Sequence, residues 1–404
     1  MKAVGVIVEY NPFHNGHAYH LQKAREKSQA DIIVAVMSGN FMQRGEPAFV
    51  SKWCRTEMAL RGGCDLIFEL PYRFATQNAQ NFANGAVSML DAIGCQALCF
   101  GSEDGDIDRF KRTFAFLSTH KNNYDRNVKQ AIKKGVSYAK ALHTAFQALS
   151  PNQSYIDLSQ PNNILGYHYV KAVKSQQLNL ELLTIPRKLA QYHDPSFASK
   201  QYASASSIRR TLFSAAGKLQ DIKHVVPPST YTLLGNYLHT YGQFQKWDHY
   251  WPFLQYRLLH ISQQELQNIY EVEEGIENRI IAMAKEADHF QHFMELLKTK
   301  RYTWTRLQRI CTHILTNSTK ADMMMKKEKA TYLRLLGMTN KGKQYLQQIK
   351  KKTSVPIIAK VSAYKEKDME ADLRAARIYA TGLQKQCQIP FLKKEFSQPP
   401  IIID

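Results

Sequence analysis

Residues 3–17 read Ala3-Val4-Gly5-Val6-Ile7-Val8-Glu9-Tyr10-Asn11-Pro12-Phe13-His14-Asn15-Gly16-His17. The first six are apolar and mostly β-branched, and the run is too short for a helix, so it predicts a buried, central strand of a parallel sheet. Asn11-Pro12 ends the strand, Gly16 allows a tight turn, and the stretch from Ala18 to Lys27 predicts a helix. A strand, a short loop and a helix N-terminus make an anion-binding site, because unpaired amide N–H groups and the positive end of the helix dipole converge there.

Two histidines, His14 and His17, lie in this loop. Each imidazole offers an N–H donor to phosphate oxygens. A nucleophile that attacks the α-phosphate of a nucleotide builds negative charge on it, so donors placed there stabilise the transition state. A metal pair would need third and fourth ligands at suitable spacing, and none occurs nearby. Two solvated loop histidines are the other alternative, but the position between a strand and a helix favours phosphate binding.

The first half of the chain alternates strand-like and helix-like stretches, which predicts an α/β fold with a Rossmann-like, doubly wound parallel sheet. The further strands are expected at residues 31–37, 64–71, 95–100 and 179–185, and the further helices at residues 51–61, 79–93 and 104–150. Ligands of such sheets bind outside the carboxyl ends of the strands. The loops that follow the strands are therefore candidate site segments.

Four such segments carry candidate site residues. Gln43-Arg44-Gly45-Glu46-Pro47 could form a second wall of the site or an ordinary surface loop. Gly101 could let a base or ribose lie against the backbone, or be a plain turn glycine. Arg187-Lys188 follows the fifth strand, and Arg187 can pair bidentately with a phosphate. Asn162 or Asn163 predicts the N-cap of a helix.

A second anion-binding element is predicted at Ser204-Ala205-Ser206-Ser207-Ile208-Arg209. Serines before a helix that begins near Ile208 offer hydroxyl and amide donors to an anion, and Arg209 adds a cation. A serine-rich N-cap is common on its own, so the argument depends on finding two such elements in one α/β domain.

The composition indicates a globular protein. The 404 residues suffice for two domains, and 44% of them are hydrophobic. There is no apolar run of about 18 residues and no signal-peptide pattern, so we expect a soluble cytoplasmic protein without a membrane span. The six cysteines are scattered among mostly apolar residues, which favours reduced core thiols. Pro227-Pro228 marks a boundary between residues 1–225 and a mostly helical, basic domain at 226–404, where Val355-Pro356-Ile357-Ile358 predicts one short edge strand.

The formal net charge is +20, and the distribution of the charged residues along the chain is more informative than the total. Residues 298–360 hold 16 Lys and Arg side chains against 2 Asp and Glu, a field that favours a polyanionic partner such as nucleic acid. A merely basic, solvated surface is the alternative. The stretch 302–310 predicts a helix whose arginines and interleaved Tyr302 and Trp304 could clasp RNA, although these aromatic residues could equally lie in the core. The candidate RNA-binding residues are Arg301, Arg306, Arg309, Lys326 and Lys327.

Residues 6–17 resemble the His-x-Gly-His signature of the nucleotidyltransferase superfamily. With Met37-Ser38-Gly39-Asn40-Phe41-Met42-Gln43-Arg44-Gly45-Glu46-Pro47-Ala48, the pattern is similar to one family in it, the bacterial tRNA(Met) cytidine acetate ligases. Residues 204–209 resemble the Ser-Ser/Thr-x-x-Ile-Arg element that the superfamily places over the triphosphate. Class I aminoacyl-tRNA synthetases carry a lysine there, and its absence argues against that class.

The resemblance implies an ATP-dependent ligase that activates acetate as acetyl-adenylate and acetylates N4 of the wobble cytidine of elongator tRNA(Met). It implies ATP and Mg²⁺ as substrate and cofactor, no metal-binding side chains, and His14, His17 and Arg209 as catalytic residues. The ATP-binding residues that it implies are Ile7, Val8, Glu9, Tyr10, Asn11, Pro12, Phe13, His14, Asn15, Gly16, His17, His20, Gly101, Asn162, Arg187, Lys188, Ser204 and Ser207. The identities of acetate and of cytidine come only from the resemblance.

Two other functions fit parts of the pattern. A small-molecule adenylyl- or cytidylyltransferase would share both anion-binding elements, but its activity would survive loss of residues 298–360. A non-catalytic RNA-binding protein would keep the basic segment and tolerate His17→Ala.

Overall fold

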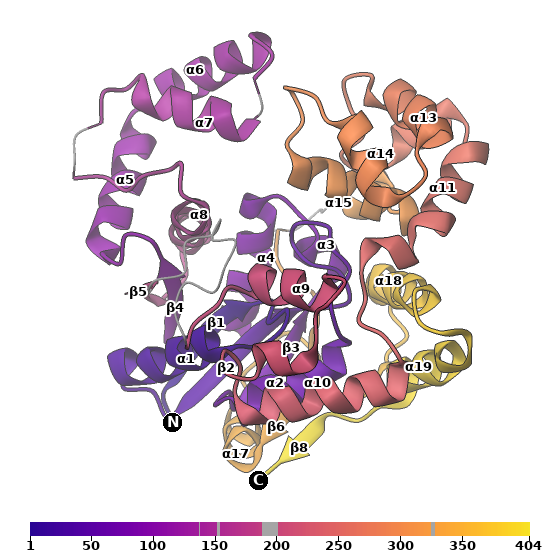
Figure 1. Cartoon of the computed structure of the whole chain (residues 1–404). Coiled ribbons are helices and arrows are strands. Elements are labelled where there is room, and N and C mark those ends of the chain that lie inside the picture. Colours follow the sequence, from indigo (N-terminus) through magenta and orange to yellow (C-terminus); the bar gives the residue numbers. More distant parts are fainter. Residues whose placement is uncertain (137, 152–153, 188–200, 325–327) are drawn as a thin grey trace.

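The computed structural model describes residues 1–136, 138–151, 154–187, 201–324 and 328–404. Its centre is a sheet that contains eight strands among the described residues, in the order β5-β4-β1-β2-β3-β6-β7, with β8 beside β6 (Figure 1). The strands are β1 Ala3–Val8, β2 Ile32–Ser38, β3 Leu66–Leu70, β4 Ala97–Ser102, β5 Glu181–Pro186, β6 Leu333–Thr339, β7 Ile357–Ile358 and β8 Ile401–Ile403. Strands β1 to β5 pair in parallel, which confirms the predicted fold class.

The strand β1 lies at the middle of the parallel part, as its apolar sequence predicts. Val4 is opposite Ile33 of β2 on one side and Ala97 of β4 on the other. Residues 3 to 6 are buried, because both faces of the sheet are covered by helices. The carboxyl ends of β1, β2, β4 and β5 therefore share one edge of the sheet.

The helices cover both faces of the sheet. Those of the first half are α1 Asn15–Ser28, α2 Lys52–Arg61, α3 Tyr72–Ala75, α4 Ala79–Ala92, α5 Ile107–Thr119, α6 Lys121–Lys133, α7 Tyr138–Gln147, α8 Pro161–Ser175 and α9 Ala205–Phe213. Phe82 of α4 and Tyr169 of α8 belong to the core on one face. Leu21 of α1, Trp53 of α2 and Ile208 of α9 belong to the core on the other face.

The second half is mostly helical. Its helices are α10 Pro228–Tyr241, α11 Trp251–His260, α12 Gln263–Asn268, α13 Ile276–Glu286, α14 Phe290–Leu297, α15 Trp304–Leu315, α16 Lys320–Met323, α17 Asn340–Ile349, α18 Glu370–Thr381 and α19 Lys385–Ser397. Short 3₁₀ turns occur at η1 Leu219–Ile222, η2 Trp247–His249, η3 Val361–Ala363 and η4 Lys367–Met369. No helix in the described ranges is long and apolar enough to cross a bilayer.

The second half also returns to the central sheet, which the sequence pattern does not indicate. The strand β6 pairs antiparallel with β3, and β8 pairs with β6; of the three added strands only β7 is predicted. The β6 sequence contains Arg334, which is only 3% exposed. Its guanidinium lies 2.6 Å from Glu395 and 3.0 Å from Glu69, so the charge is compensated inside the core. A buried charge of this kind conceals the strand from a search for apolar runs.

Two helical lobes stand above the sheet in Figure 1. The α5–α7 lobe, residues 107–147, follows the carboxyl end of β4 and appears at upper left. The α11–α15 lobe, residues 251–315, appears at upper right, and its apolar residues, which include Leu254, Ile280 and Ile310, share one core with Phe41 of the loop after β2 and Tyr379 of α18. All six cysteines are free thiols, as predicted.

Candidate active site

The loop between β1 and α1 is closed by reciprocal hydrogen bonds. His14 is the N-cap of α1, and its Nδ1 accepts from the Gly16 N–H at 3.1 Å. The His14 N–H in turn donates to Nδ1 of His17 at 3.3 Å. This is a capping box built from two histidines. The helix therefore begins at Asn15, three residues before the predicted start at Ala18.

These hydrogen bonds fix the tautomers of both rings. A backbone N–H can only donate, so each Nδ1 must be unprotonated and each neutral ring must carry its proton on Nε2. Neither Nε2 has a hydrogen-bond partner among the described residues. The rings are stacked with centroids 3.6 Å apart, so they present two neighbouring N–H donors at a helix N-terminus.

Burial keeps the imidazoles neutral. It lowers the pKa of His14 to about 3, with the positive charge of Arg187 as the second cause. The pKa of His17 lies well below its usual value because of burial and then the neighbouring His14 and Arg187. The pKa of His20 falls to about 4 for the same two reasons as that of His14, and its buried Nε2 has no hydrogen-bond partner in the described part of the chain. Three neutral imidazoles thus lie at intervals of three residues.

Aromatic residues of the same loop hold the His17 ring. Its centroid lies 4.8 Å from that of Tyr10 and 5.6 Å from that of Phe13, and both of these residues are buried. The small residue at position 16 is equally required, because a Cβ on Gly16 would lie 2.9 Å from Cε1 of His14. Any larger side chain there would displace the His14 ring.

Asn15 ties the start of α1 to the chain on both sides of α9. Its side-chain amide donates to the carbonyls of Gln201 and His224, at 2.9 and 3.1 Å. Ile7 and Val8 are half-buried at the carboxyl end of β1, and the Asn11–Pro12 peptide bond is cis. The loop from Ile7 to His17 is therefore fixed at both of its ends.

The ends of β4 and β5 bring Gly101 and Arg187 together. A Cβ on Gly101 would lie 3.6 Å from Cγ of Arg187, and the Arg187 guanidinium donates to Oδ1 of Asn162 at 3.3 Å. Asn162 is not the N-cap that was predicted. Gln160 holds that position, and Asn162 and Asn163 lie in the first turn of α8.

The carboxylate of Glu103 replaces an asparagine cap at this helix start. It accepts from the Asn162 N–H at 3.2 Å, the Asn162 side chain at 2.6 Å and the Asn163 N–H at 2.7 Å. A carboxylate at a helix N-terminus is favoured by the orphan N–H groups and by the dipole. Glu103 thereby positions Asn162, which in turn contacts Arg187.

The second predicted element forms the start of α9. Ser204 is the N-cap, and its hydroxyl accepts from the Ser207 N–H at 3.1 Å. The helix begins at Ala205, earlier than the predicted Ile208. Arg209 donates to the carbonyl of Asn11 at 2.8 Å and pairs with Glu46 at 2.6 Å. Arg209 therefore joins the His14 loop to the loop that follows β2.

That loop, residues 42–46, contacts three parts of the molecule. The Gln43 N–H donates to Glu9 at 2.6 Å, and burial is the main cause that raises the Glu9 pKa. Gly45 has φ +80, and a Cβ there would lie 2.5 Å from the Arg309 backbone nitrogen of α15. Residues 42–46 thus touch Glu9, Arg209 and α15, as a second wall of the site would.

Sequence reasoning missed Arg55, which lies on α2 and is wholly buried. Its guanidinium donates to the carbonyls of Glu9 and Ser38, both at 2.8 Å, and to that of Gly39. It thereby ties together the carboxyl ends of β1 and β2. Its helix, α2, buries a second cation, Lys52, so no sequence signal singles out Arg55.

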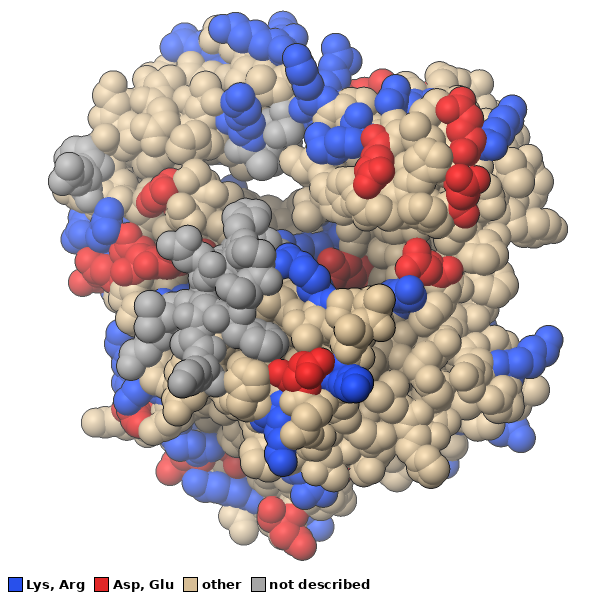
Figure 2. All heavy atoms as spheres, in the orientation of Figure 1, with Lys and Arg blue, Asp and Glu red and all other residues tan. Residues whose placement is uncertain are grey.

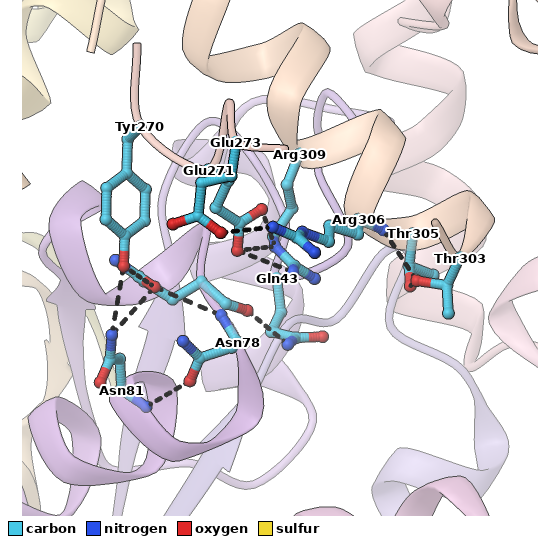
Figure 3. Close-up of polar contacts among 11 residues, drawn as sticks. Gln43, Asn78, Asn81, Tyr270, Glu271, Glu273, Thr303, Thr305, Arg306 and Arg309 are labelled. Atoms are coloured by element: carbon cyan, nitrogen blue, oxygen red, sulfur yellow. Dashed lines mark hydrogen bonds and ion pairs between the residues drawn. The ribbon is translucent and has the colours of Figure 1, made fainter. Parts of the chain in front are cut away.

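The candidate RNA-binding arginines of α15 are already partnered (Figure 3). Arg309 forms a two-pronged pair with Glu271, with distances of 2.8 to 3.1 Å, and both side chains are about nine-tenths buried. Arg306 lies 2.8 Å from Glu273 and covers the Tyr302 ring at 4.6 Å. Tyr302 is a core residue at 3% exposure, which settles one of the two alternatives for this aromatic residue.

Hydrogen bonds also join the α11–α15 lobe and residues 42–46 to the loop before α4. Tyr270 and Asn81 both donate to the Gln77 side-chain oxygen at 3.2 Å, and Gln43 donates to the Gln77 carbonyl at 2.6 Å (Figure 3). Residues 42–46 therefore lie between Glu9 and the α11–α15 lobe. Arg301 is exposed, whereas Lys188, Lys326 and Lys327 lie outside the described residues.

No group of three or more His, Cys, Asp or Glu side chains within the described ranges is arranged to hold a metal ion. A Mg²⁺ ion that accompanies ATP needs no such group, since phosphate oxygens and water supply most of its ligands. The site is therefore compatible with a metal ion that arrives with the nucleotide.

Comparison with known families now identifies the chain's relatives. Residues 1–393 match the family model described as HIGH Nucleotidyl Transferase. A protein of Bacillus licheniformis named tRNA(Met) cytidine acetate ligase is 45% identical over 100% of this chain and 98% of its own length. A protein of the same name from Geobacillus sp. is 47% identical over the full length of both chains.

Solved structures agree with this result. The crystal structure of Thermotoga maritima TmcAL in its apo form I superposes with a TM-score of 0.92, at 31% identity and with both chains fully covered. The same protein bound with alpha-thio ATP superposes with a TM-score of 0.90. The paired histidines, the parallel sheet and these similarities point the same way. The chain belongs to the HIGH nucleotidyl transferase family.

Proposed function

We propose that this protein is a tRNA(Met) cytidine acetate ligase. In the proposed reaction it activates acetate with ATP and acetylates N4 of the wobble cytidine of elongator tRNA(Met). Full-length relatives at 45 to 47% identity carry this name, and a structural neighbour binds an ATP analogue. The observation that carries the proposal is the stacked pair of neutral imidazoles, His14 and His17, at the start of α1.

In the first step an acetate oxygen attacks the α-phosphorus of ATP, and the bond to the bridging oxygen of pyrophosphate breaks. The Nε2–H groups of His14 and His17 donate to the phosphoryl oxygens as their charge develops. Arg187 adds a positive charge, which also disfavours protonation of the imidazoles. Neutral N–H donors suit this role because they stabilise the anion while the imidazoles themselves stay unprotonated on Nδ1.

The remaining ATP residues support this step. Ser204 and Ser207 offer hydroxyls at the start of α9, Gly101 leaves room beside the backbone, and Asn162 orients Arg187. Arg209 holds Asn11 and Glu46, and we propose that it also contributes charge to the phosphates. Mg²⁺ carried by ATP would neutralise the leaving pyrophosphate. We also propose Lys188, the residue after Arg187, as an ATP-binding residue.

In the second step the cytidine amine attacks the carbonyl carbon of acetyl-adenylate. The new C–N bond replaces the C–O bond to AMP, the amine loses a proton, and AMP leaves as the anion. We propose Glu9, which follows β1 directly, as the acceptor of this proton, because burial raises its pKa above that of an exposed glutamate.

We further propose that residues 1–225 carry the nucleotide chemistry and that residues 226–404 bind the RNA. Arg301 and Arg306, with Lys326 and Lys327, are the proposed contacts of this part, whereas we propose that Arg309, which is already paired with Glu271, holds residues 42–46 in place. Since tRNA is a cytoplasmic substrate in bacteria, we place the enzyme in the cytoplasm.

The test is incubation with ATP, labelled acetate and bacterial tRNA, with acid-precipitable label as the readout. We expect label that requires ATP and that RNase removes, with N4-acetylcytidine as the labelled nucleoside. His17→Ala should abolish it, and His239→Ala is the matched control because His239 is exposed on α10. Pyrophosphate release with another acid or phosphate ester, without RNA labelling, would instead indicate a small-molecule nucleotidyltransferase.

A further inference from the structure

The helix α6 carries an unusual set of exposed cations. Residues 121–134 contain five Lys and Arg side chains and one acidic residue, Asp125. All five cations are exposed: Lys121, Arg126, Lys129, Lys133 and Lys134. The helix buries only Val128 and Ala131, which pack against Ala141 and Ala145 of α7 in a small separate core. The cations are therefore not needed to fold the lobe.

Most of these cations lack a partner that would neutralise them. Lys121 lies 3.8 Å from Asp125, and Arg126 donates to the neutral side chain of Asn123 at 3.1 Å. Lys129, Lys133 and Lys134 have no ion pair or hydrogen bond from their side chains within the part of the chain that the structure describes. The arginines of α15 differ in this respect, because Glu271 and Glu273 neutralise them.

The end of α6 lies close to a second group of cations. A Cβ on Gly135, just beyond α6, would lie 3.6 Å from Nε of Arg301. Arg301 belongs to an exposed basic stretch before α15 that also contains Lys298 and Lys300. The basic end of α6 and the basic stretch before α15 therefore lie close together, although they are far apart in the sequence. Figure 2 shows Lys and Arg side chains along the upper rim of both lobes and an open gap beneath their point of approach.

This gap lies on the catalytic side of the sheet. The α5–α7 lobe is inserted after the carboxyl end of β4, and α15 packs on the loop that follows the carboxyl end of β2. The stretch Glu9–His17 follows β1, which lies between these two strands. A polyanion that bridges the lobes would therefore pass over the edge where the nucleotide site lies.

We propose that Lys129, Lys133 and Lys134 of α6, together with Lys298, Lys300 and Arg301, form a two-sided phosphate-binding surface for the RNA substrate. The proposal rests on the proposed function, because it assigns a second contact to the same RNA. It also places RNA binding on both halves of the chain. Cations at positions i and i+4 of a helix lie on one face, about 6 Å apart, and can each neutralise a backbone phosphate.

The test compares two double charge reversals that change the net charge equally. Lys129→Glu/Lys133→Glu alters α6, and Lys385→Glu/Lys393→Glu alters two exposed lysines of α19, which lies at lower right in Figure 1, on the opposite side of the view from α6. Affinity for tRNA(Met) is measured by filter binding over a range of salt concentrations. Acetate-dependent release of pyrophosphate, the product of the first step, is measured without RNA on the same preparations.

We expect the α6 variant to lose at least tenfold in tRNA affinity at about 0.1 M salt, with a salt dependence shallower by about one to two ion equivalents. The α19 variant should lose less than threefold. The milder Lys129→Gln/Lys133→Gln removes the charges without adding acidic side chains. It should give an intermediate loss, so the result does not depend on the fold of the charge-reversal variant alone. Equal losses in both reversals, or none in the α6 variant, would overturn the proposal.

The two proposals fail in different ways. If the wild type binds tRNA through α6 but never acetylates it, the surface stands and the ligase function is wrong. If acetylation occurs while the α6 variants bind tRNA as the wild type does, the function stands and this surface is wrong. Binding of the α6 cations to anionic lipid vesicles with no affinity for RNA would also overturn the proposal.

Discussion

Two regions of this molecule were expected from the sequence to bind anions, and their side chains are used differently. The His14 and His17 rings are neutral, but each has an Nε2–H group at a helix N-terminus that no described residue accepts from. Arg306 and Arg309 are fully charged cations, but Glu273 and Glu271 already accept their hydrogen bonds. The region with less charge therefore has more donors available to a phosphate.

The difference shows that charge counted along a sequence and donors available in a structure are separate quantities. Arg309 and Glu271 are 38 residues apart, and their pairing fixes the α11–α15 lobe beside residues 42–46. We infer that Arg309 positions the site wall and that the neutral histidines bind phosphate. Four predictions test this distinction, in order of decreasing effect.

The largest effect should come from the histidines. His17→Ala removes one of two donors aimed at the developing charge, so acetate-dependent AMP formation should fall roughly 10²- to 10³-fold. The affinity for tRNA should change less than twofold in the same variant, as measured by filter binding. If AMP formation persists while tRNA affinity collapses, the assignments of the two regions are reversed.

Arg309→Ala should act on stability. It leaves the Glu271 carboxylate unpaired at about one-tenth exposure, so the free energy of unfolding should fall by roughly 2 to 3 kcal/mol in urea titrations. Glu271→Ala added to this variant should cause little further loss, because the pair is already broken. A stable Arg309→Ala protein with weakened tRNA binding would show instead that Arg309 serves the RNA directly.

The third prediction concerns pH. The pKa of His14 is lowered from 6.5 to about 3 in the folded chain, so below pH 6.5 the unfolded chain binds a proton that the folded chain does not. His14 therefore contributes stability that is present above pH 6.5 and is lost as the pH falls towards 3. Between about pH 7 and pH 5 the wild type should lose roughly 2 kcal/mol more than His14→Asn, which keeps a helix-capping acceptor. Equal losses in urea titrations would mean that His14 is protonated in the fold.

The smallest effect should come from Glu273→Gln. This change releases Arg306 from a pair whose acid is 55% exposed, so stability should change by less than about 1 kcal/mol. If Arg306 contacts RNA, tRNA affinity should rise by about two- to threefold, and Arg306→Gln should reverse the gain. No change in affinity in either variant would remove Arg306 from the proposed RNA surface.

The features that the sequence predicted are those encoded over short distances. The strand β1, the turn and the start of α1 lie within 15 residues, and a serine caps α9 as its serine-rich start predicts, although the helix begins at Ala205 and not near Ile208. The parallel order of the sheet follows from the same alternation of strands and helices. Local pattern therefore identified the Rossmann-like half and the two helix starts at which we propose anion binding.

The missed features depend on partners far apart in the chain. The strand β6 contains Arg334, which Glu69 and Glu395 compensate, and Lys52 is buried because it pairs with the same two acids. Glu103 displaced the expected role of Asn162, since a carboxylate 59 residues away caps α8. No pattern within one segment indicates which distant acid will neutralise a given cation.

The most direct test is ¹⁵N NMR of histidine side chains, with His14→Asn and His17→Asn used for assignment. We predict that both rings carry their proton on Nε2 at about pH 7 and keep that neutral form at about pH 5. Addition of an ATP analogue should shift the Nε2 signals of His14 and His17 and leave that of His239 unchanged. Protonation of both nitrogens of His14 and His17 above about pH 6 would contradict the account, because the donors would then be cations.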